Sequence, residues 1–191
     1  MSDAQPSGPP FTTQVRVRYA DTDAEGVVYY GSYLVYFEVA RVELLRDLGC
    51  PIGEARERGL VFPAVSATCN YRRPGRVDDL LDVRLWLGRI GRASFDFAYH
   101  VCRGDELLAD GTTRHAAVDV GSGRAVALPD WFVDLWSRAG ERIGSTAHAR
   151  GAARTAGESA PATTAGAARP AGQSDPTATA ATAGAAARGS S

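Results

Sequence analysis

Two aspartates, Asp21 and Asp23, stand one residue apart in the segment DTDAEG, and a run of apolar and glycine residues follows them. A carboxylate can take a proton from water or attack an electrophilic carbon directly. Helical periodicity begins shortly afterwards, near Tyr33. The amides at the N-terminus of a helix carry partial positive charge and can stabilise a negative oxygen. The segment is therefore the strongest candidate in this chain for a reaction with an anionic transition state.

The same loop has two simpler interpretations. DTDAEG matches the opening of a calcium loop, with oxygen ligands at positions one, three and five and glycine at position six. Position twelve should be a bidentate Glu but is Ser32, and a strand pattern rather than a helix pattern precedes the loop. We therefore expect no calcium. Paired aspartates also occur in solvated turns, where they bond to nearby amides. The apolar residues and helix start that follow weaken this second interpretation.

Other catalytic groups are scarce. All 21 basic residues are Arg, and the absence of Lys excludes a Walker-type phosphate loop and a Schiff base, which both need an amine. The cysteines and histidines are isolated along the chain, so no pair has the spacing of a zinc site. They are Cys50, Cys69, Cys102, His100, His115 and His148. We assign no metal site and expect the cysteines to be small residues of the core.

Charge and composition limit the possible partners and the compartment. The net charge of −1 argues against a broad nucleic-acid-binding or polybasic membrane surface. No apolar run approaches the ~20 residues that span a bilayer. The first twelve residues lack the basic start and apolar stretch of a secretory signal. These features predict a soluble, cytoplasmic protein.

The chain divides into one predicted domain and two polar ends. Residues 1–10 are rich in Pro, Gly and Ser and are expected to be a flexible leader, whereas residues 11–143 contain every predicted strand and helix. Residues 144–191 contain no Leu, Ile, Val, Met or aromatic residue. Such a segment cannot offset a backbone entropy loss of ~1 to 2 kcal/mol per residue. The sequence therefore predicts a disordered tail.

Within the domain, the periodicity predicts strands around one long helix. Residues 13–20 alternate as a half-buried strand does. Residues 33–48 have helical spacing, Gly49 ends the helix, and Ser32 is placed to cap its first amides. The strands predicted after the helix are 62–71, 80–87, 93–103 and 107–120, and Pro129 opens a short amphipathic helix. The expected fold is α+β, an antiparallel sheet of about five strands wrapped around a central helix.

The long helix carries a second carboxylate of interest, Glu38. Leu34 and Phe37 lie on its apolar stripe, and Tyr36 falls on the other side. Glu38 falls inside the stripe, three residues before Arg41, which is the spacing of a helical ion pair. We therefore expect Glu38 to be structural rather than catalytic.

The string RYADTDAEGVVYYGSYLVYFEVAR, from Arg18 to Arg41, resembles the signature of hot-dog-fold acyl-CoA thioesterases. The resemblance is to the 4-hydroxybenzoyl-CoA thioesterase class and is closest to the Tol-Pal-associated bacterial branch. It continues through VSATCNYRRPGRVDDLLDV and GRASFDFAYHV to about Arg142, so it covers the predicted domain and none of the tail. It implies a hot-dog fold and hydrolysis of an acyl-CoA to free acid and coenzyme A, with no metal or other cofactor.

The resemblance also implies a site. The catalytic carboxylate, as general base or nucleophile, falls on Asp23, and the amide that polarises the thioester carbonyl falls on Tyr30, with Gly31 beside it. Asp21 falls on a residue that structures the loop. The Tol-Pal branch usually has His where this chain has Tyr30, and the 4-hydroxybenzoyl branch has Tyr. An oxyanion site built from a backbone amide does not depend on that side chain.

Coenzyme A carries phosphates, which Arg can bind with two parallel hydrogen bonds. Arg92, in the segment GRAS, is the first candidate because family members contact the nucleotide there. The cluster of Arg72, Arg73 and Arg76 is the second. Ser66 falls where the family's pocket lies and is a weak candidate.

A five-stranded sheet has two open edges, and a sheet this small around one helix leaves apolar surface uncovered. We therefore expect a homo-oligomer whose site is shared between two subunits. A dimer is the minimum, and we expect a tetramer. Two alternatives remain open. A hot-dog dehydratase needs a catalytic His, but neither His100 nor His115 follows the helix entrance. A non-catalytic acyl-CoA binding or sensing domain has no need of Asp23.

Overall fold

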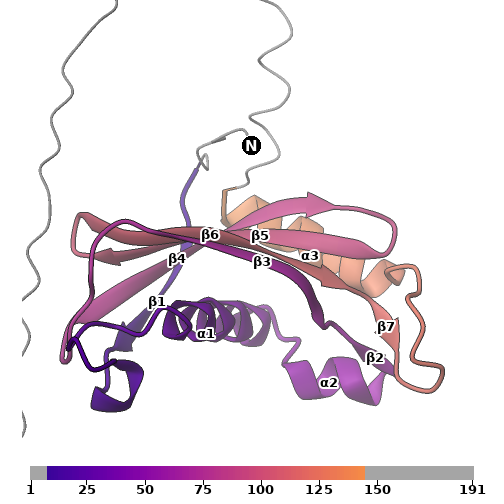
Figure 1. The fold of residues 1–191 in the computed structure, drawn as a ribbon. Coiled ribbons are helices and arrows are strands. Elements are labelled where there is room, and N and C mark those ends of the chain that lie inside the picture. Colours follow the sequence, from indigo (N-terminus) through magenta and orange to yellow (C-terminus); the bar gives the residue numbers. More distant parts are fainter. Residues whose placement is uncertain (1–7, 145–191) are drawn as a thin grey trace, which may run out of the picture. The chain divides into compact units, whose positions relative to one another are not determined.

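A computed structural model of the chain describes residues 8–144. Its main feature is a five-stranded antiparallel sheet with the strand order β1-β4-β5-β6-β3. The strands are β1 Phe11–Arg16, β3 Ala64–Tyr71, β4 Leu80–Ile90, β5 Ser94–Arg103 and β6 Glu106–Ala116. One long helix, α1 (Ser32–Asp47), lies under the concave face of this sheet (Figure 1). The predicted α+β architecture, with one central helix inside a curled sheet, is confirmed.

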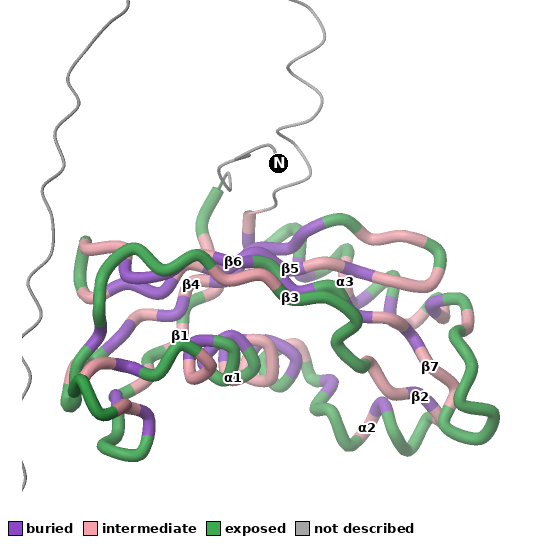
Figure 2. The backbone as a smooth tube through the Cα atoms, in the orientation of Figure 1, coloured by how far each residue is buried: buried purple, intermediate pink, exposed green. Residues whose placement is uncertain are grey.

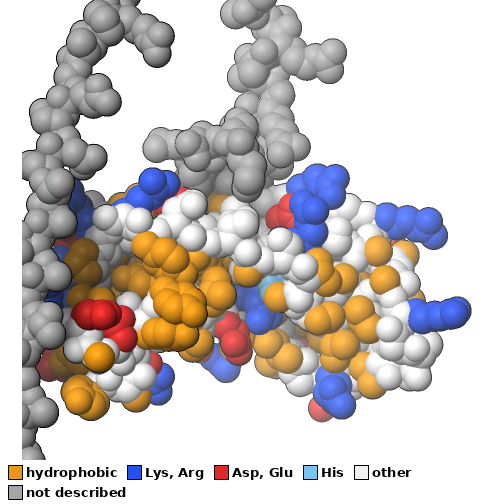
Figure 3. Space-filling view, in the orientation of Figure 1, with side chains coloured by type: hydrophobic (Ala, Val, Ile, Leu, Met, Phe, Trp, Pro, Cys, Tyr) orange, Lys and Arg blue, Asp and Glu red, His pale blue; other side chains and the backbone are white. Residues whose placement is uncertain are grey.

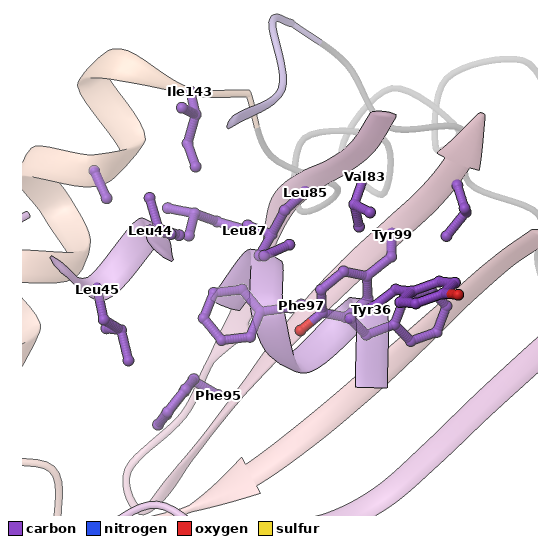
Figure 4. Packing of buried hydrophobic residues seen from close by; sticks show 14 of the residues in the cluster. Tyr36, Leu44, Leu45, Val83, Leu85, Leu87, Phe95, Phe97, Tyr99 and Ile143 are labelled. Atoms are coloured by element: carbon purple, nitrogen blue, oxygen red, sulfur yellow. The ribbon is translucent and has the colours of Figure 1, made fainter. Parts of the chain in front are cut away.

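The core lies between α1 and the sheet. Alternate residues of β4 and β5 point toward the helix, and these residues are almost fully buried. Figure 4 shows several of them, among them Val83, Leu85, Leu87, Phe97 and Tyr99, together with Tyr36, Leu44 and Leu45 of α1. At about 25 cal/mol per Å² of buried apolar area, this layer is the main source of stability.

One glycine permits the close contact between helix and sheet. The ring of Phe37 stacks on Tyr99 with 4.4 Å between the ring centroids. A Cβ atom on Gly111, in the neighbouring strand β6, would lie 2.7 Å from the Phe37 ring and 2.1 Å from the Thr68 carbonyl oxygen. A larger residue at this position would therefore push the helix away from the sheet.

Several short elements complete the described part of the chain. They are the 3-10 turn η1 (Tyr19–Asp21), the helix α2 (Ile52–Glu57) and a two-stranded sheet of β2 (Leu60–Val61) with β7 (Val118–Asp119). The sequence did not predict α2, and it extended the first strand to Ala20, where the structure has the turn η1. The predicted C-terminal helix is present as α3 (Asp130–Arg142).

The faces of α1 differ from the predicted ones. Tyr36 is 2% exposed and belongs to the core, whereas Leu34 is 40% exposed. Glu38 is exposed, and the structure contains no ion pair between Glu38 and Arg41 among residues 8–144. The ideal helical wheel placed the buried face of α1 too far toward Leu34. The wheel uses only the positions of apolar residues, and it does not show that the sheet covers the face that carries Tyr36.

Strand β3 forms one edge of the sheet, and most of its residues are exposed (Figure 2). At the other side of the domain, the Trp86 indole donates a hydrogen bond to the Gly8 carbonyl oxygen (3.0 Å), and the Gly144 amide donates one to Pro9 (2.6 Å). Both acceptors lie in the segment that the sequence assigns to a leader. The predicted tail, from residue 145 onward, lies outside the described residues.

Candidate functional site

The loop between β1 and α1, residues 17–31, is held against the segment that joins β3 to β4. The Val17 amide donates to the Asp79 carbonyl oxygen (2.9 Å), and the Val28 amide donates to Gly75 (2.9 Å). The backbone of the loop also bridges to itself between Thr22 and Val28. The loop is therefore a tight structure fixed at both of its ends.

Asp21 holds this loop from inside. Its side chain is 7% exposed and accepts hydrogen bonds from the Arg18 amide (2.9 Å) and the Arg18 guanidinium (2.6 Å). Its carbonyl oxygen accepts two more, from the Tyr29 amide (2.8 Å) and the Ser32 hydroxyl (3.0 Å). The bonds from Arg18 hold the pKa of the Asp21 carboxyl below its ordinary value. A carboxylate with this many partners has a structural role.

Tyr36 approaches Asp21 from α1. Burial first, and then the negative charge of Asp21, raise the pKa of the Tyr36 hydroxyl. Its oxygen is buried, yet it makes no hydrogen bond of good geometry within the part of the chain that the structure describes. Tyr36 therefore packs behind the loop and remains protonated.

The carboxylate of Asp23 has fewer hydrogen-bond partners than that of Asp21. Its side chain is half-buried, and its Oδ1 accepts hydrogen bonds from the amides of Glu25 (3.0 Å) and Val27 (3.4 Å). Its Oδ2 has no protein partner among residues 8–144. The two amide bonds fix the direction of the carboxylate, because they bind one oxygen and leave the other available for water or substrate.

The entrance of α1 leaves backbone donors unused. The N-cap residue is Gly31, and no side chain among residues 8–144 caps the helix. The predicted capping role of Ser32 is wrong, because its hydroxyl bonds to the Asp21 carbonyl oxygen instead. The amides of Tyr30 and Gly31 find no acceptor in the described segment. These two N–H groups lie at the positive end of a helix of 16 residues, where negative charge is stabilised.

Aromatic rings surround this entrance. The rings of Tyr29 and Tyr30 are 4.3 Å apart, and those of Tyr33 and Tyr71 are 5.5 Å apart. Tyr30 is 63% exposed, so its ring is open to a bound molecule. A Cβ on Gly31 would lie 2.8 Å from the Tyr29 ring, which explains why this position has no side chain.

The predicted arginine cluster lies close to the loop, since it flanks Gly75. Arg72 bonds to Asp110 (2.6 Å), and Arg73 pairs with Glu106 (3.3 Å). Arg76 is exposed and has no ion pair with any residue between 8 and 144. Of the three cations, Arg76 is therefore the one whose charge is available to a phosphate.

Arg92 and Ser66 lie away from the loop. Arg92 comes two residues after Ile90, the last residue of β4, whereas the loop adjoins the first residue of this strand, since the Val17 amide bonds to Asp79. The ten steps along this strand of 11 residues, at about 3.3 Å each, separate its two ends by about 33 Å. Ser66 is exposed on the edge strand β3, five positions before Tyr71. Within one chain, neither residue meets Asp23.

A second group of polar side chains is buried between α1 and the sheet. The Tyr99 hydroxyl lies 3.0 Å from Thr113 Oγ1, which lies 2.9 Å from His115 Nε2, and His115 Nδ1 lies 3.1 Å from the Phe62 carbonyl oxygen. Burial lowers the pKa of His115 to about 4, and nearby Arg41 adds to this effect. The sequence did not reveal this chain of contacts, because its members lie on two strands, β5 and β6, and on the segment that connects β2 to β3.

The described residues contain no cluster of three or more metal-ligating side chains. Cys50 and Cys102 are buried and Cys69 is partly buried, and none of the three forms a disulfide within residues 8–144. In the same region, no helix is long and apolar enough to cross a membrane.

Comparisons with known proteins give a consistent result. Residues 17–135 match the family model described as the thioesterase-like superfamily. The acyl-CoA thioesterase YbgC of Haemophilus influenzae is 37% identical, over 62% of this chain and 88% of its own. The 1,4-dihydroxy-2-naphthoyl-CoA hydrolase of a Synechococcus strain is 36% identical, over 64% and 86%. A crystal structure of an Aquifex aeolicus protein superposes with a TM-score of 0.64 and 36% identity, over 66% of this chain and 98% of that one.

Proposed function

Because the chain belongs to the thioesterase-like superfamily, we propose that it hydrolyses the thioester of an acyl-CoA to a free acid and coenzyme A. The observation that carries the proposal is that one loop, residues 17–31, holds both Asp23, whose Oδ2 has no partner among residues 8–144, and the amides of Tyr30 and Gly31, which have no acceptor there. Hydrolysis of a thioester needs a base or nucleophile on one side of the carbonyl and hydrogen-bond donors for the oxygen on the other.

The proposed mechanism uses these groups in sequence. The thioester oxygen accepts hydrogen bonds from the Tyr30 and Gly31 amides, and the helix N-terminus stabilises the negative charge that develops there. Asp23 then takes a proton from water while that water adds to the carbonyl carbon. The tetrahedral oxyanion collapses, the carbon–sulfur bond breaks, and the coenzyme A thiolate leaves and takes up the proton. No cofactor is needed for this reaction.

Asp23 can also act as the nucleophile, forming a mixed anhydride with release of the thiolate. Water then hydrolyses the anhydride and restores the carboxylate. A single turnover in H₂¹⁸O detects the anhydride route when water attacks the aspartyl carbon. Attack of water on the aspartyl carbon of an anhydride places ¹⁸O in Asp23, whereas the general-base route places it only in the released acid.

The motif from Arg18 to Arg41 supports a finer placement, in the 4-hydroxybenzoyl-CoA thioesterase class and closest to its Tol-Pal-associated branch. Tyr30 supports the class more than the branch, because the branch usually has His at this position. Acyl-CoA substrates also favour the cytoplasm as the location, since the reaction consumes a cytoplasmic thioester.

We propose that the active protein is a homo-oligomer, at least a dimer, in which the second copy completes the site. Figure 3 shows hydrophobic side chains gathered on the face of the molecule that α1 and β3 form in the view of Figure 1. The exposed apolar residues of these two elements include Leu34, Val35, Val65 and Tyr71. An edge strand with unpaired backbone groups beside such a patch is suited to pairing with a second copy. Dimers of this kind commonly assemble further into tetramers.

A second copy also offers a role for Arg92. Arg92 lies beyond one end of β4, and the loop that carries Asp23 adjoins the other end of this strand of about 33 Å, so we propose that Arg92 serves this site from the partner subunit. Arg76, which lies beside the loop and has no ion pair among the described residues, is the cation that the same chain provides. We assign phosphate binding to these two residues, with Arg72, Arg73 and Ser66 as weaker candidates.

The test is hydrolysis by the full-length protein of a panel of acyl-CoA esters with aliphatic and aromatic acyl groups, followed by release of the free thiol. We expect turnover of at least one substrate. Tight binding of acyl-CoA without hydrolysis would favour the binding or sensing domain, and hydration of an unsaturated acyl thioester without thiol release would favour the dehydratase.

A further inference from the structure

The carbonyl oxygen of Tyr30 is not used by the helix that follows it. In an α-helix this oxygen would accept from the amide four residues later, that of Leu34. Here the Leu34 amide donates to Gly31 instead, at 3.1 Å. The Tyr71 hydroxyl takes the vacant place and donates to the Tyr30 carbonyl oxygen at 3.0 Å.

Tyr71 is well suited to hold this contact. It is the last residue of β3, where its partner in the sheet is Ala109, so its backbone is fixed by the strand pairing. Its ring packs against Tyr33, which in turn accepts a hydrogen bond from the Gly75 amide (3.2 Å). Burial raises the pKa of the Tyr71 hydroxyl to about 12. The group is therefore a protonated donor throughout the working pH range.

The peptide unit between Tyr30 and Gly31 needs such a restraint. A peptide bond is planar, so the direction of the Tyr30 carbonyl determines the direction of the Gly31 N–H, which points the opposite way. Glycine on one side of the unit lowers the barrier to rotation of the whole plane. The preceding plane is fixed separately, because the Tyr29 carbonyl oxygen accepts from the Ser32 amide at 2.9 Å.

We infer that Tyr71 is a positioning residue, which orients the Gly31 amide as the second oxyanion donor through its hydrogen bond to the Tyr30 carbonyl. This inference rests on the proposed thioesterase function. Tyr71 acts on the transition state through the backbone and makes no contact with the reacting atoms. Donors that are already oriented cost no reorganisation when the negative charge develops.

The variant Tyr71→Phe tests this inference because it removes the hydroxyl and keeps the ring contact with Tyr33. We expect kcat to fall about tenfold with KM within about twofold of the wild type, since the lost interaction acts only in the transition state. Tyr99→Phe is the matched control, because it removes a buried hydroxyl bonded to Thr113, away from the loop. It should lower the melting temperature and leave kcat unchanged.

Two non-hydrolysable ligands separate positioning from direct contact. One is a ketone, acyl-CH₂-S-CoA, and the other is the thioether in which the carbonyl is a methylene. Tyr71→Phe should weaken binding of the ketone about threefold and leave the thioether unchanged, since only the ketone uses the amide donors. Equal weakening of both ligands, or a kcat equal to that of the wild type, would overturn the inference.

Failure of the proposed function is a separate result. If the wild type hydrolyses no thioester, that function is wrong, and the ratio of ketone to thioether affinity still tests Tyr71 because it requires no turnover. If the wild type is active and Tyr71→Phe is equally active with an unchanged ratio, only the role of Tyr71 is wrong.

Discussion

Two polar regions adjoin the helix α1, and their hydrogen-bonding groups are used in opposite ways. At its entrance, the Asp23 Oδ2 and the amides of Tyr30 and Gly31 have no partner among the described residues. Between α1 and the sheet, every group in the series of contacts from Tyr99 to the Phe62 carbonyl oxygen is used. Polar groups that are paired inside the protein have no capacity for a ligand, whereas groups that are open to water can exchange that water for a substrate, so the entrance is where a ligand is expected.

The buried chain has one consistent direction. The Phe62 carbonyl can only accept, so His115 carries its proton on Nδ1, and Nε2 accepts from the Thr113 hydroxyl. The Thr113 oxygen then accepts from Tyr99. Nothing is left over to bind a substrate. The comparison therefore predicts that changes at the entrance reduce activity, whereas changes in the buried chain reduce stability.

The largest expected effect is at Asp23. Asp23→Asn should lower kcat by about a hundredfold or more, the usual scale for loss of a general base, with little change in melting temperature. Glu25→Gln is the matched control, since Glu25 is an exposed carboxylate of the same loop. It should retain wild-type kcat. An Asp23→Asn variant as active as the wild type would refute the assigned role of the entrance.

The buried chain should respond to acid. The pKa of His115 is lowered to about 4, so its neutral form is favoured in the folded state. The stabilisation is fully present above the unfolded pKa of about 6.5 and is lost as the pH falls toward 4, by up to about 3 kcal/mol. Urea unfolding between pH 7.5 and 4.5 measures this slope.

The matched variant for this measurement is His115→Asn, in which His100, whose pKa burial also lowers, remains. The variant should be less stable at neutral pH and should show a flatter slope between pH 6.5 and 4.5. An unchanged slope would mean that another group titrates in this range. The kcat of the variant should stay near the wild-type value.

Variants of Arg92 test whether the candidate site at the α1 entrance includes residues from a second subunit. Arg92→Ala should raise KM for acyl-CoA about fivefold to a hundredfold with little change in kcat, and the effect should shrink with salt. An equal mixture of Arg92→Ala and Asp23→Asn chains should recover about a quarter of wild-type kcat/KM, because half the dimers are mixed and each has one intact site. No recovery would contradict a shared site.

The smallest effect is expected from the C-terminal segment. Removal of residues 145–191, which contain no large apolar side chain, should change the melting temperature by less than about 2 °C and leave kcat unchanged. The cut is placed after Gly144 because its amide bonds to Pro9. A larger shift would show that the segment contributes to the domain.

Sequence patterns predicted the main strands and helices, but not α2 or the turn η1, because the pattern of each main element depends on residues close together in the chain. The period of two in β4 and β5 and the helical spacing of α1 were sufficient for the fold. The contact of Tyr71 with Tyr30, by contrast, spans 41 positions, and no local pattern reports it. The ion pair between Arg18 and Asp21 is a contact that the sequence could have indicated, because the two residues are three positions apart.

The two ends of the described domain meet at one place. The Gly144 amide donates a hydrogen bond to the Pro9 carbonyl oxygen. The α-carbon of Gly144 lies 3.0 Å from the position that a Cβ atom on Gly8 would take. A chain whose ends are neighbours tolerates circular permutation. A short linker from Gly144 to Gly8, with a new opening in the exposed turn at Ser122 and Gly123, should fold to the same domain with α3 at its N-terminal side. The order in which the helices and strands are synthesised is then a free choice for the engineer.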